Sequence, residues 1–434
     1  MPQAITIFWH RRDLRIEDNA GLYKSLKLNC PVMPIFIFDK NILSKLPSND
    51  QRVRFIHEEI TRLKAEYQEL GSELNVYYGE PLAIFNEIST KFDVKIVFLN
   101  RDYEPYAVKR DQQIYDFLNS KGIEMIGAKD HVIFEKNEIV KDDQKPYTIF
   151  TPYSKKWKAK LESFHLKAYP TLKYSKNLLA FEAITIPALF QMGFENAVVH
   201  KIPGRDLKAL QIDNYDALRN IPSKLGTSRM SVHLRFGTIS IRELANIAKS
   251  KNEQFLNELI WRDFYQMIIH YFPHSINNSF KAQYDKIVWE NDETQFEAWC
   301  EGKTGYPIVD AGMRELNATG FMHNRVRMIT ASFLTKHLLI DWRWGEAYFA
   351  EKLLDFDLAS NVGGWQWAAS SGCDAAPYFR VFNPELQTLK FDKDLKYVKE
   401  WIPEYGTTSY LPPIVDHKFA RERVLARFKE ALNG

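Results

Sequence analysis

The first third of the chain alternates short apolar runs with longer amphipathic stretches. The apolar runs are rich in β-branched and aromatic residues, and they are Ala4–Trp9, Val32–Phe38, Leu74–Tyr78 and Ile96–Leu99. The amphipathic stretches are Arg52–Leu70, Leu82–Phe92 and Tyr106–Ser120. Buried strands that alternate with helices predict an α/β domain with a doubly wound parallel sheet, whose strand ends often hold a nucleotide. No GxGxxG or Walker loop follows a strand, so this part gives no signal for a phosphate-binding loop.

The pattern changes twice further along the chain. Residues from about 130 to 222 are less regular, with scattered prolines and a basic run at Lys155–Lys160 that is typical of a solvated helix face. From Gly226 onward the apolar spacing is helical, over Ile241–Ser250, Glu253–Tyr271, Phe296–Glu301, Ile308–Thr319, Val326–Leu339 and Trp344–Leu354. We therefore expect an α/β domain over residues 1–130, a connector over 131–222 and a mostly α-helical domain over 223–434.

Composition narrows the class of protein. The 434 residues are 45% hydrophobic and 14% aromatic, which is enough for sizeable cores and suggests bulky packing or a ring-shaped ligand. A net charge of +3 is weak, so binding of nucleic acid would need a local basic surface. Cys30, Cys300 and Cys373 are far apart and fit reduced thiols, with no metal or disulfide spacing. The chain shows neither a signal peptide nor an apolar run of ~18 residues, so we expect a cytoplasmic protein.

Small and aromatic residues concentrate in the stretch Asn361–Arg380, which contains a glycine pair and two tryptophans. Small residues let a backbone approach a planar ligand, although such residues can also fill a core where helices cross. Trp365 and Trp367 are two positions apart, about 200° around a helix, so they can face opposite ways. Asn361 lies one turn before Trp365 on the same face, an arrangement that core packing alone does not require.

The predicted helix Glu253–Tyr271 carries a polar and aromatic face. The spacing i, i+3, i+4 and i+7 places together Glu258, Trp261, Arg262 and Tyr265. A carboxylate, an indole and a guanidinium on one face suit a nucleobase, which needs stacking and hydrogen bonds at its edge. A plain surface helix would explain the charges but not the large indole beside them.

Two further segments contain candidate ligand-binding residues. Gly226–Ser231 places hydroxyl groups before a helix, where they could bind a diphosphate or act as an ordinary N-cap. In Met322–Met328, Asn324 and Met328 share one side of a helix while the two arginines point elsewhere. Asp355 and Asp357 are candidate partners for these arginines, through structural ion pairs or around a ligand.

Several of these segments together resemble the photolyase/cryptochrome family of blue-light flavoproteins. The matching segments are Trp9–Arg15, Tyr306–Arg314, Met322–Met328, Asn361–Arg380 and Phe391-Asp392, in the family's order and over most of the chain. Within the family the chain is most similar to class I photolyases that repair cyclobutane pyrimidine dimers. The resemblance implies an N-terminal α/β antenna domain and a C-terminal helical domain that holds FAD.

The resemblance also implies roles for single residues. Positions around the FAD diphosphate are Tyr215, Thr227, Ser228, Met230 and Ser231. Positions that flank the flavin and adenine rings are Arg327, Asp355, Asp357 and Asn361, the last facing the nitrogen of the central flavin ring. The electron relay is Trp365, Trp342 and Trp289. The wall of the lesion pocket is Glu258, Trp261, Asn324, Met328 and Trp367, and contacts to the DNA backbone come from Arg325 and Arg380. The expected catalytic residues are Glu258, Asn324, Met328 and Asn361, and no metal site is expected.

The implied activity is light-driven repair of UV-damaged DNA. A pyrimidine dimer stacks poorly, so flipping it out of the duplex costs less than flipping a normal base. Tryptophan faces supply stacking of roughly 1–3 kcal/mol per base, and Glu258 can hydrogen-bond the thymine edge. Excited, reduced FAD would give one electron to the dimer and receive it back after the ring splits.

Three alternatives stay open. A six-four photolyase would be expected to carry histidines where this chain has Asn324 and Met328. A cryptochrome, a signalling protein, often has a long C-terminal extension, whereas about forty residues follow Asp392, partly helical over Lys418–Leu432. A flavin electron-transfer protein would not need the basic and aromatic wall that Arg325, Arg380, Trp261 and Trp367 form.

The sequence determines least about the second chromophore and the oligomeric state. The Asn-Glu pair with which relatives bind folate is replaced by Tyr106 and Ala107, so a deazaflavin, a folate or no antenna is possible. We expect a monomer that binds UV-damaged DNA and no membrane.

Overall fold

The computed structural model describes residues 3–181, 185–196 and 202–433, and they form two compact units. The sheet unit comprises Met1–Glu135, Leu161–Lys208 and Met230–Ile247. The helical unit comprises Lys136–Lys160, Ala209–Arg229 and Ala248–Gly434. The expected connector thus contributes residues to both units, and part of the expected helical domain groups with the sheet. The division at residues 130 and 222 stays a prediction about domains.

The sheet unit is built on five parallel strands in the order β3-β2-β1-β4-β5. The strands are β1 (Ala4–His10), β2 (Val32–Asp39), β3 (Asn75–Gly79), β4 (Asp93–Asn100) and β5 (Glu124–Ala128). The first four match the apolar runs of the sequence. β5 was missed because Glu124 and Gly127 interrupt its apolar pattern. The strand order reverses between β1 and β4, which confirms a doubly wound sheet.

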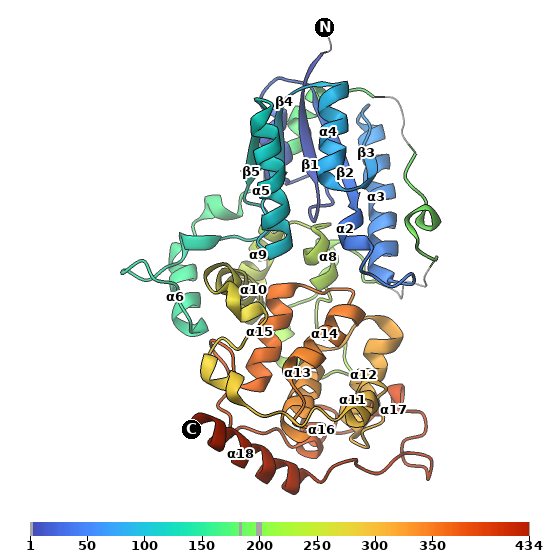
Figure 1. Cartoon of the computed structure of the whole chain (residues 1–434), viewed down its shortest axis with the longest axis vertical. Coiled ribbons are helices and arrows are strands. Elements are labelled where there is room, and N and C mark those ends of the chain that lie inside the picture. Colours follow the sequence, from blue (N-terminus) through green and yellow to red (C-terminus); the bar gives the residue numbers. More distant parts are fainter. Residues whose placement is uncertain (1–2, 182–184, 197–201, 434) are drawn as a thin grey trace. The chain divides into compact units, whose positions relative to one another are not determined.

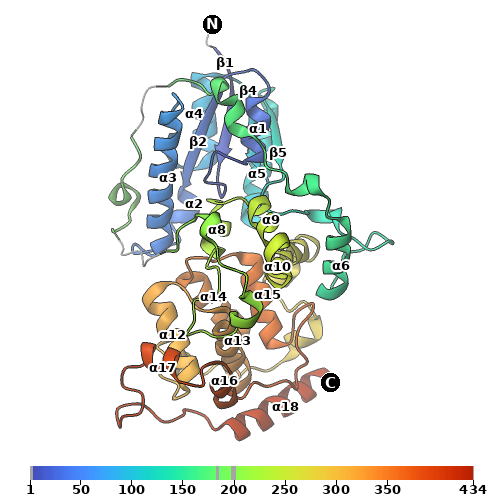
Figure 2. The ribbon, with the colours of Figure 1, turned by 180° about the vertical axis from the view of Figure 1, so that it is seen from behind.

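Helices cover both faces of this sheet. α4 (Pro81–Lys91) and α5 (Pro105–Ser120) pack together on one face, and α1 (Ala20–Leu26) and α3 (Gln51–Glu69) lie on the other (Figures 1 and 2). Short segments complete the unit, namely α2 (Lys40–Leu43), α8 (Ser231–Phe236) and most of α9 (Ile241–Lys251).

The arginines that follow β1 form ion pairs within the sheet unit. Arg11 Nη1 lies 2.5 Å from Asp111, and Arg12 Nη1 lies 2.8 Å from Glu104. Arg15 Nη2 lies 2.7 Å from Asp130. The carboxylates in these three ion pairs are not those of the sequence neighbours Asp13, Glu17 and Asp18. The actual partners are distant in sequence and meet at the strand ends.

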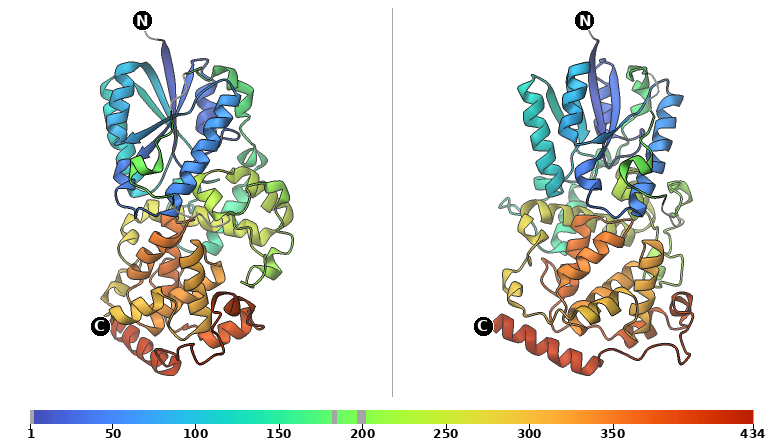
Figure 3. Two further views of the ribbon diagram at one scale, coloured as in Figure 1. Left: turned by 90° about the vertical axis from the view of Figure 1, so that its right-hand side faces the viewer. Right: turned by 45° about the vertical axis from the view of Figure 1, so that its right-hand side comes forward.

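The helical unit consists of short and medium helices (Figure 3). They are α6 (Phe150–Lys160), α7 (Tyr215–Leu218), α10 (Glu253–Tyr271), α11 (Glu293–Cys300), α12 (Pro307–Thr319), α13 (Asn324–Ser332), α14 (Trp342–Lys352), α15 (Leu358–Ala369), α16 (Pro384–Phe391), α17 (Lys396–Trp401) and α18 (His417–Asn433). The expected helix Val326–Leu339 is not continuous, because α13 passes into a π-helical turn over Phe333–His337. Among the described residues no helix combines the length and apolarity that crossing a bilayer requires.

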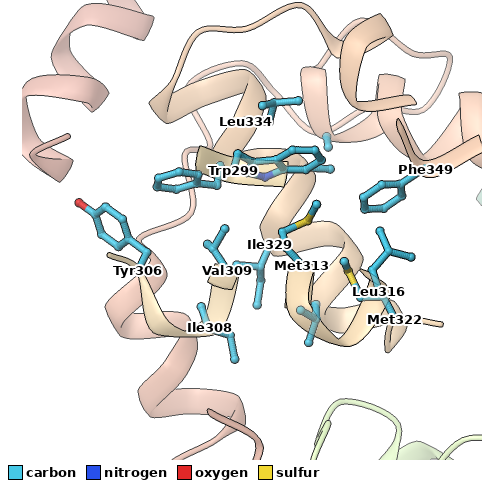
Figure 4. Packing of buried hydrophobic residues seen from close by; sticks show 14 of the residues in the cluster. Trp299, Tyr306, Ile308, Val309, Met313, Leu316, Met322, Ile329, Leu334 and Phe349 are labelled. Carbon is cyan, nitrogen blue, oxygen red and sulfur yellow. The ribbon is translucent and has the colours of Figure 1, made fainter. Parts of the chain in front are cut away.

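The core of the helical unit lies where α12, α13 and α14 meet (Figure 4). Met313 and Leu316 of α12 pack with Ile329 of α13, Phe349 of α14 and the fully buried Trp299 of α11. These positions repeat at helical spacing in the sequence, and their burial fixes the helices that carry the candidate site.

Candidate functional site

Helix α15 holds three of the predicted site residues. Asp357 caps its N-terminus by accepting a hydrogen bond from the Ser360 backbone amide at 3.1 Å, and the helix ends at Ser370, whose φ is +70°. Asn361 is 9% exposed, and its Nδ2 donates to Glu346 Oε1 at 2.8 Å and to the Glu346 carbonyl oxygen at 3.1 Å. Because Glu346 accepts both bonds, it fixes the orientation of the Asn361 amide, with Nδ2 directed toward Glu346. No sequence motif pointed to Glu346.

Trp365 and Trp367 lie in different environments, as their spacing predicted. Trp365 is 2% exposed and meets the rings of Phe349 and Trp299 edge-on, with centroids 5.0 and 6.0 Å away. A Cβ on Gly345 would lie 2.1 Å from the Trp365 ring, so this glycine lets α14 approach α15. Trp367 is only partly buried and contributes to the wall of a small pocket between α10 and α15.

The other two predicted relay tryptophans belong to the same apolar cluster as Trp365. Trp342, the first residue of α14, is 1% exposed, and the partly buried Trp289 packs against this cluster. The Trp289 ring centroid lies 6.1 Å from that of Phe428 on α18. The three tryptophans thus range from fully to partly buried, as a relay toward the surface would require.

The predicted flavin and adenine neighbours Arg327, Asp355 and Asp357 each have hydrogen-bond or ion-pair partners. Arg327 Nη2 lies 2.9 Å from Asp355 Oδ2, and its Nε donates to the Met322 carbonyl oxygen at 2.8 Å. Gln266 of α10 donates to both carboxylate oxygens of Asp357, at 3.3 and 3.2 Å. Arg327 is therefore in an ion pair, which orients its guanidinium and is compatible with a second role at a ligand.

The predicted diphosphate-binding residues come from two segments. Tyr215 lies on α7 and meets Phe255 of α10 edge-on, with ring centroids 5.1 Å apart. The second segment is Thr227, Ser228, Met230 and Ser231, which follow one another where the chain passes from the helical unit to α8 of the sheet unit. Between them, Arg229 has a φ of +53°, unusual for a residue other than glycine.

The predicted lesion wall on α10 has two partners that the sequence did not indicate. Phe150 of α6 stacks face to face on Trp261, with centroids 3.7 Å apart and planes 4° apart. One face of the indole is therefore covered, and a base could stack only on the other. Glu258 forms an ion pair with Arg219, Nη1 to Oε1 at 2.5 Å, and accepts from Gln254 Nε2 at 2.9 Å. The contacts of Phe150 with Trp261 and of Arg219 with Glu258 join segments far apart in sequence, which periodicity cannot predict.

Tyr265 links the two sides of the pocket. Its ring lies 5.3 Å from Trp261 on the same helix, and it contributes to the pocket wall together with Trp367. A Cβ on Gly363 would lie 2.3 Å from the Tyr265 ring, so α15 can pack directly on α10 only because this position is glycine. Burial raises the pKa of Tyr265, so its hydroxyl stays protonated.

The residues predicted to contact DNA gather near α13. Asn324 is exposed at the start of the helix and Met328 is half-buried one turn later. Arg325 is held by Asn220, whose Oδ1 accepts from Nη2 at 2.7 Å and from Nε at 3.1 Å. Burial, followed by the nearby Arg219 and Arg380, lowers the pKa of Arg325. Arg219 and Arg380 therefore lie near Arg325, and Arg219 is itself paired with Glu258.

His323 lies at the N-terminus of α13, near these arginines. It caps α13 by accepting from the Arg325 backbone amide at 3.2 Å, and it is 4% exposed. Burial and the surrounding arginines lower its pKa to about 4, so the imidazole is neutral at physiological pH.

The polar groups of these helices fit FAD. Several buried side-chain atoms of the described residues lack a hydrogen-bond partner, and among them are Trp365 Nε1 on α15, Gln266 Oε1 on α10 and His323 Nε2 beside α13. An unpartnered buried polar atom costs about 1–3 kcal/mol, so a ligand with both donors and acceptors would stabilise this arrangement. FAD offers both, together with a flat ring system for the aromatic surroundings.

A three-layer α/β unit and a helical unit with buried tryptophans, an asparagine and paired arginines define a flavin-binding class of protein. Comparison with known families agrees: residues 6–173 match the DNA photolyase model, and residues 255–409 match the FAD binding domain of DNA photolyase. The chain belongs to the DNA photolyase family and binds FAD.

Relatives extend over the whole chain. Deoxyribodipyrimidine photo-lyases from a Synechococcus species and from Escherichia coli are 35% and 34% identical; the alignments cover 98% and 99% of this chain and 97% and 99% of the relatives. An archaeal photolyase structure from Sulfolobus tokodaii with two FAD molecules is 35% identical, with a TM-score of 0.86 over 98% of this chain and 100% of that one. A bacterial class III photolyase from Agrobacterium tumefaciens is 30% identical, with a TM-score of 0.85 over 100% and 99%.

Proposed function

We propose that this protein repairs cyclobutane pyrimidine dimers in DNA by light-driven electron transfer from FAD. The observation that carries the proposal is the contact between α10 and α15. Tyr265 touches Trp261 on its own helix and, through Gly363, packs on the helix that carries Trp367. Two half-buried tryptophans, Trp367 in the pocket wall and Trp261 against Tyr265 of that wall, suit a flipped, flat dimer better than they suit a core.

The side chains of the helical unit would bind and orient the dimer. Trp367 and the uncovered face of Trp261 would supply stacking surfaces, and Asn324 and Met328 of α13 would contact the dimer. Glu258 would hydrogen-bond a thymine edge and stabilise the charge that develops on the dimer. Arg325 and Arg380 would bind backbone phosphates on either side, because guanidinium groups pair well with phosphate oxygens.

FAD, when bound and fully reduced, supplies one electron on excitation by blue light. The chain's own part is to hold the reactants and to keep water out. Asn361 would present its amide toward the central flavin ring in the orientation that Glu346 fixes. Tyr215, Thr227, Ser228, Met230 and Ser231 would hold the diphosphate, and Arg327, Asp355 and Asp357 would border the rings. Trp365, Trp342 and Trp289 would carry an electron inward to restore the reduced cofactor.

Light and a defined lesion test the proposal directly. The reduced protein is illuminated with an oligonucleotide that contains one thymine dimer, and intact thymines are measured by chromatography. We expect recovery in light and none in darkness, and no recovery with a six-four photoproduct. Failure of light-dependent recovery, with FAD confirmed as reduced, would contradict the proposal and favour a photoreceptor.

The remaining assignments are narrower proposals. We propose a class I photolyase that acts as a monomer in the cytoplasm. Asn324 and Met328, where six-four enzymes would be expected to have histidines, argue against a six-four enzyme, and the class I assignment rests on the sequence resemblance. A deazaflavin or folate as second chromophore would appear in the absorption spectrum of protein purified from its native host.

A further inference from the structure

Helix α6 has one buried face and one basic face. Its buried side chains follow the spacing of one helix face and are Phe150, Tyr153, Ser154 and Trp157. The opposite side exposes Lys155 and Lys156, which we call the lysine face of α6, while Lys160 at the end of the helix donates to the Glu138 carbonyl oxygen at 2.6 Å. The basic run of the sequence is thus one side of an amphipathic helix whose other side is anchored in the helical unit.

The anchor of α6 is α10, the helix that carries the proposed lesion wall. Phe150 stacks on Trp261, as described above, and Trp157 Nε1 donates to Asp263 Oδ2 at 3.0 Å. Trp157 is fully buried and Asp263 is 1% exposed, so this bond fixes α6 firmly. The lysine face therefore has a defined position relative to α10 and its Trp261.

Positive charge is concentrated in this part of the chain. Lys136–Lys160 contains seven lysines and three acidic residues, whereas the whole chain has a net charge of only +3. The acids do not neutralise the lysine face strongly. Lys156 lies 3.2 Å from Asp142, but the two side chains are 45% and 98% exposed, and such pairs contribute little and are screened by salt. Within the described ranges no ion pair involves Lys155.

We propose that the lysine face of α6 binds the phosphate backbone of the duplex that flanks the lesion. The inference rests on the proposed function and extends it, since it names a second DNA contact region outside the pocket. Lysine ammonium groups bind phosphates as point charges and release counterions, without reading sequence. A rigid basic face next to the stacking wall would hold one flank of the duplex while the dimer is flipped.

The experiment measures the salt dependence of DNA binding by the FAD-loaded protein. The variant Lys155→Gln/Lys156→Gln changes only exposed side chains, so the fold should be kept. Its control is Lys396→Gln/Lys399→Gln on α17, on the opposite side of the helical unit (Figures 1 and 2). Both are compared with the unchanged protein on a duplex with one thymine dimer and on the same duplex without it.

Loss of two phosphate contacts should make the slope of log K against log salt concentration shallower by about 1.8. We expect this change in the α6 variant alone, with the affinity for damaged and undamaged DNA lowered by the same factor. Shortening the duplex on one side of the dimer should weaken binding by the unchanged protein but not by the variant. Repair per absorbed photon of bound dimer should be unaltered.

An unchanged slope in the α6 variant, or an equal change in the α17 control, would overturn the inference. These results differ from a failure of the proposed function, which would appear in the unchanged protein as equal affinity for damaged and undamaged DNA.

Discussion

Asn361 and Glu346 are joined by two hydrogen bonds between neighbouring helices. Asn361 Nδ2 donates to the Glu346 carboxylate at 2.8 Å and to its carbonyl oxygen at 3.1 Å. An amide can turn either end toward a ligand, and a carboxylate can only accept from it, so Glu346 selects the orientation. The residue proposed to face the flavin is thus oriented by a residue that sequence reasoning missed.

This pair gives a prediction about stability and pH. Burial raises the pKa of Glu346 above its ordinary value of 4.5, so the folded protein holds this proton more tightly than the unfolded chain does. The stabilisation is therefore complete below about pH 4.5 and is lost as the pH rises through the folded pKa. The variant Glu346→Gln cannot ionise at this position. The difference between its free energy of unfolding and that of the unchanged protein should therefore shift in favour of the variant from pH 5 to pH 8. Urea unfolding at both pH values measures this.

The exposed Glu351 on the same helix provides the control. Glu351→Gln should show no comparable gain between the two pH values. An equal gain in both variants would mean that the effect belongs to the helix charge and not to the buried site.

Glu258 should matter more for chemistry than for binding. Glu258→Ala removes a hydrogen bond worth about 0.5–1.5 kcal/mol, so affinity for dimer-containing DNA should fall less than roughly tenfold. The yield of repair per absorbed photon should fall further, because the carboxyl group would stabilise charge that exists only after electron transfer. Quantum yield and binding are measured on the same oligonucleotide.

The ion pair with Arg219 supplies the comparison for this variant. Arg219→Gln breaks the same ion pair but keeps the Glu258 carboxyl group, so the yield of repair should be less affected. An unchanged yield in Glu258→Ala would refute the assigned role.

Trp289 should be needed for activation of the cofactor and not for repair. Trp289→Phe removes the most exposed member of the proposed relay, so photoreduction of oxidised FAD should stop while pre-reduced protein still repairs DNA. Absorption spectra under blue light and the repair assay measure the two properties. Trp344→Phe, at a partly buried tryptophan outside the relay, should leave both unchanged. Loss of both activities in Trp289→Phe would show that the relay is misassigned.

Replacing either of two glycines on neighbouring helices by alanine should change the stability of the protein, but in opposite directions. A Cβ on Gly345 would overlap the Trp365 ring, at 2.1 Å, so Gly345→Ala should destabilise the protein by about 1–3 kcal/mol. A Cβ on Gly364 would meet nothing within 4 Å, so Gly364→Ala should stabilise α15 by roughly 0.5–1 kcal/mol. Thermal unfolding measures both. A tolerated alanine at position 345 would mean that α14 and α15 do not need this close contact.

The sequence by itself determined the classes of structure and the family. Apolar runs separated by amphipathic stretches predicted the parallel sheet, because buried strands and half-buried helices have different periods. The spacing of Trp365 and Trp367 predicted their different environments, because helix geometry is local. The resemblance of several motifs, in the family's order, indicated the family and FAD, which the matches over residues 6–173 and 255–409 confirmed.

Only the tertiary structure decided which distant residues complete the site. Phe150 covers one face of Trp261, Arg219 pairs with Glu258, Asn220 holds Arg325 and Glu346 orients Asn361. The same holds for the partners of Arg11, Arg12 and Arg15, which are acids far along the chain. Periodicity describes each helix or strand alone, whereas these contacts depend on how elements pack, and packing is decided by the shapes of side chains that meet only after folding.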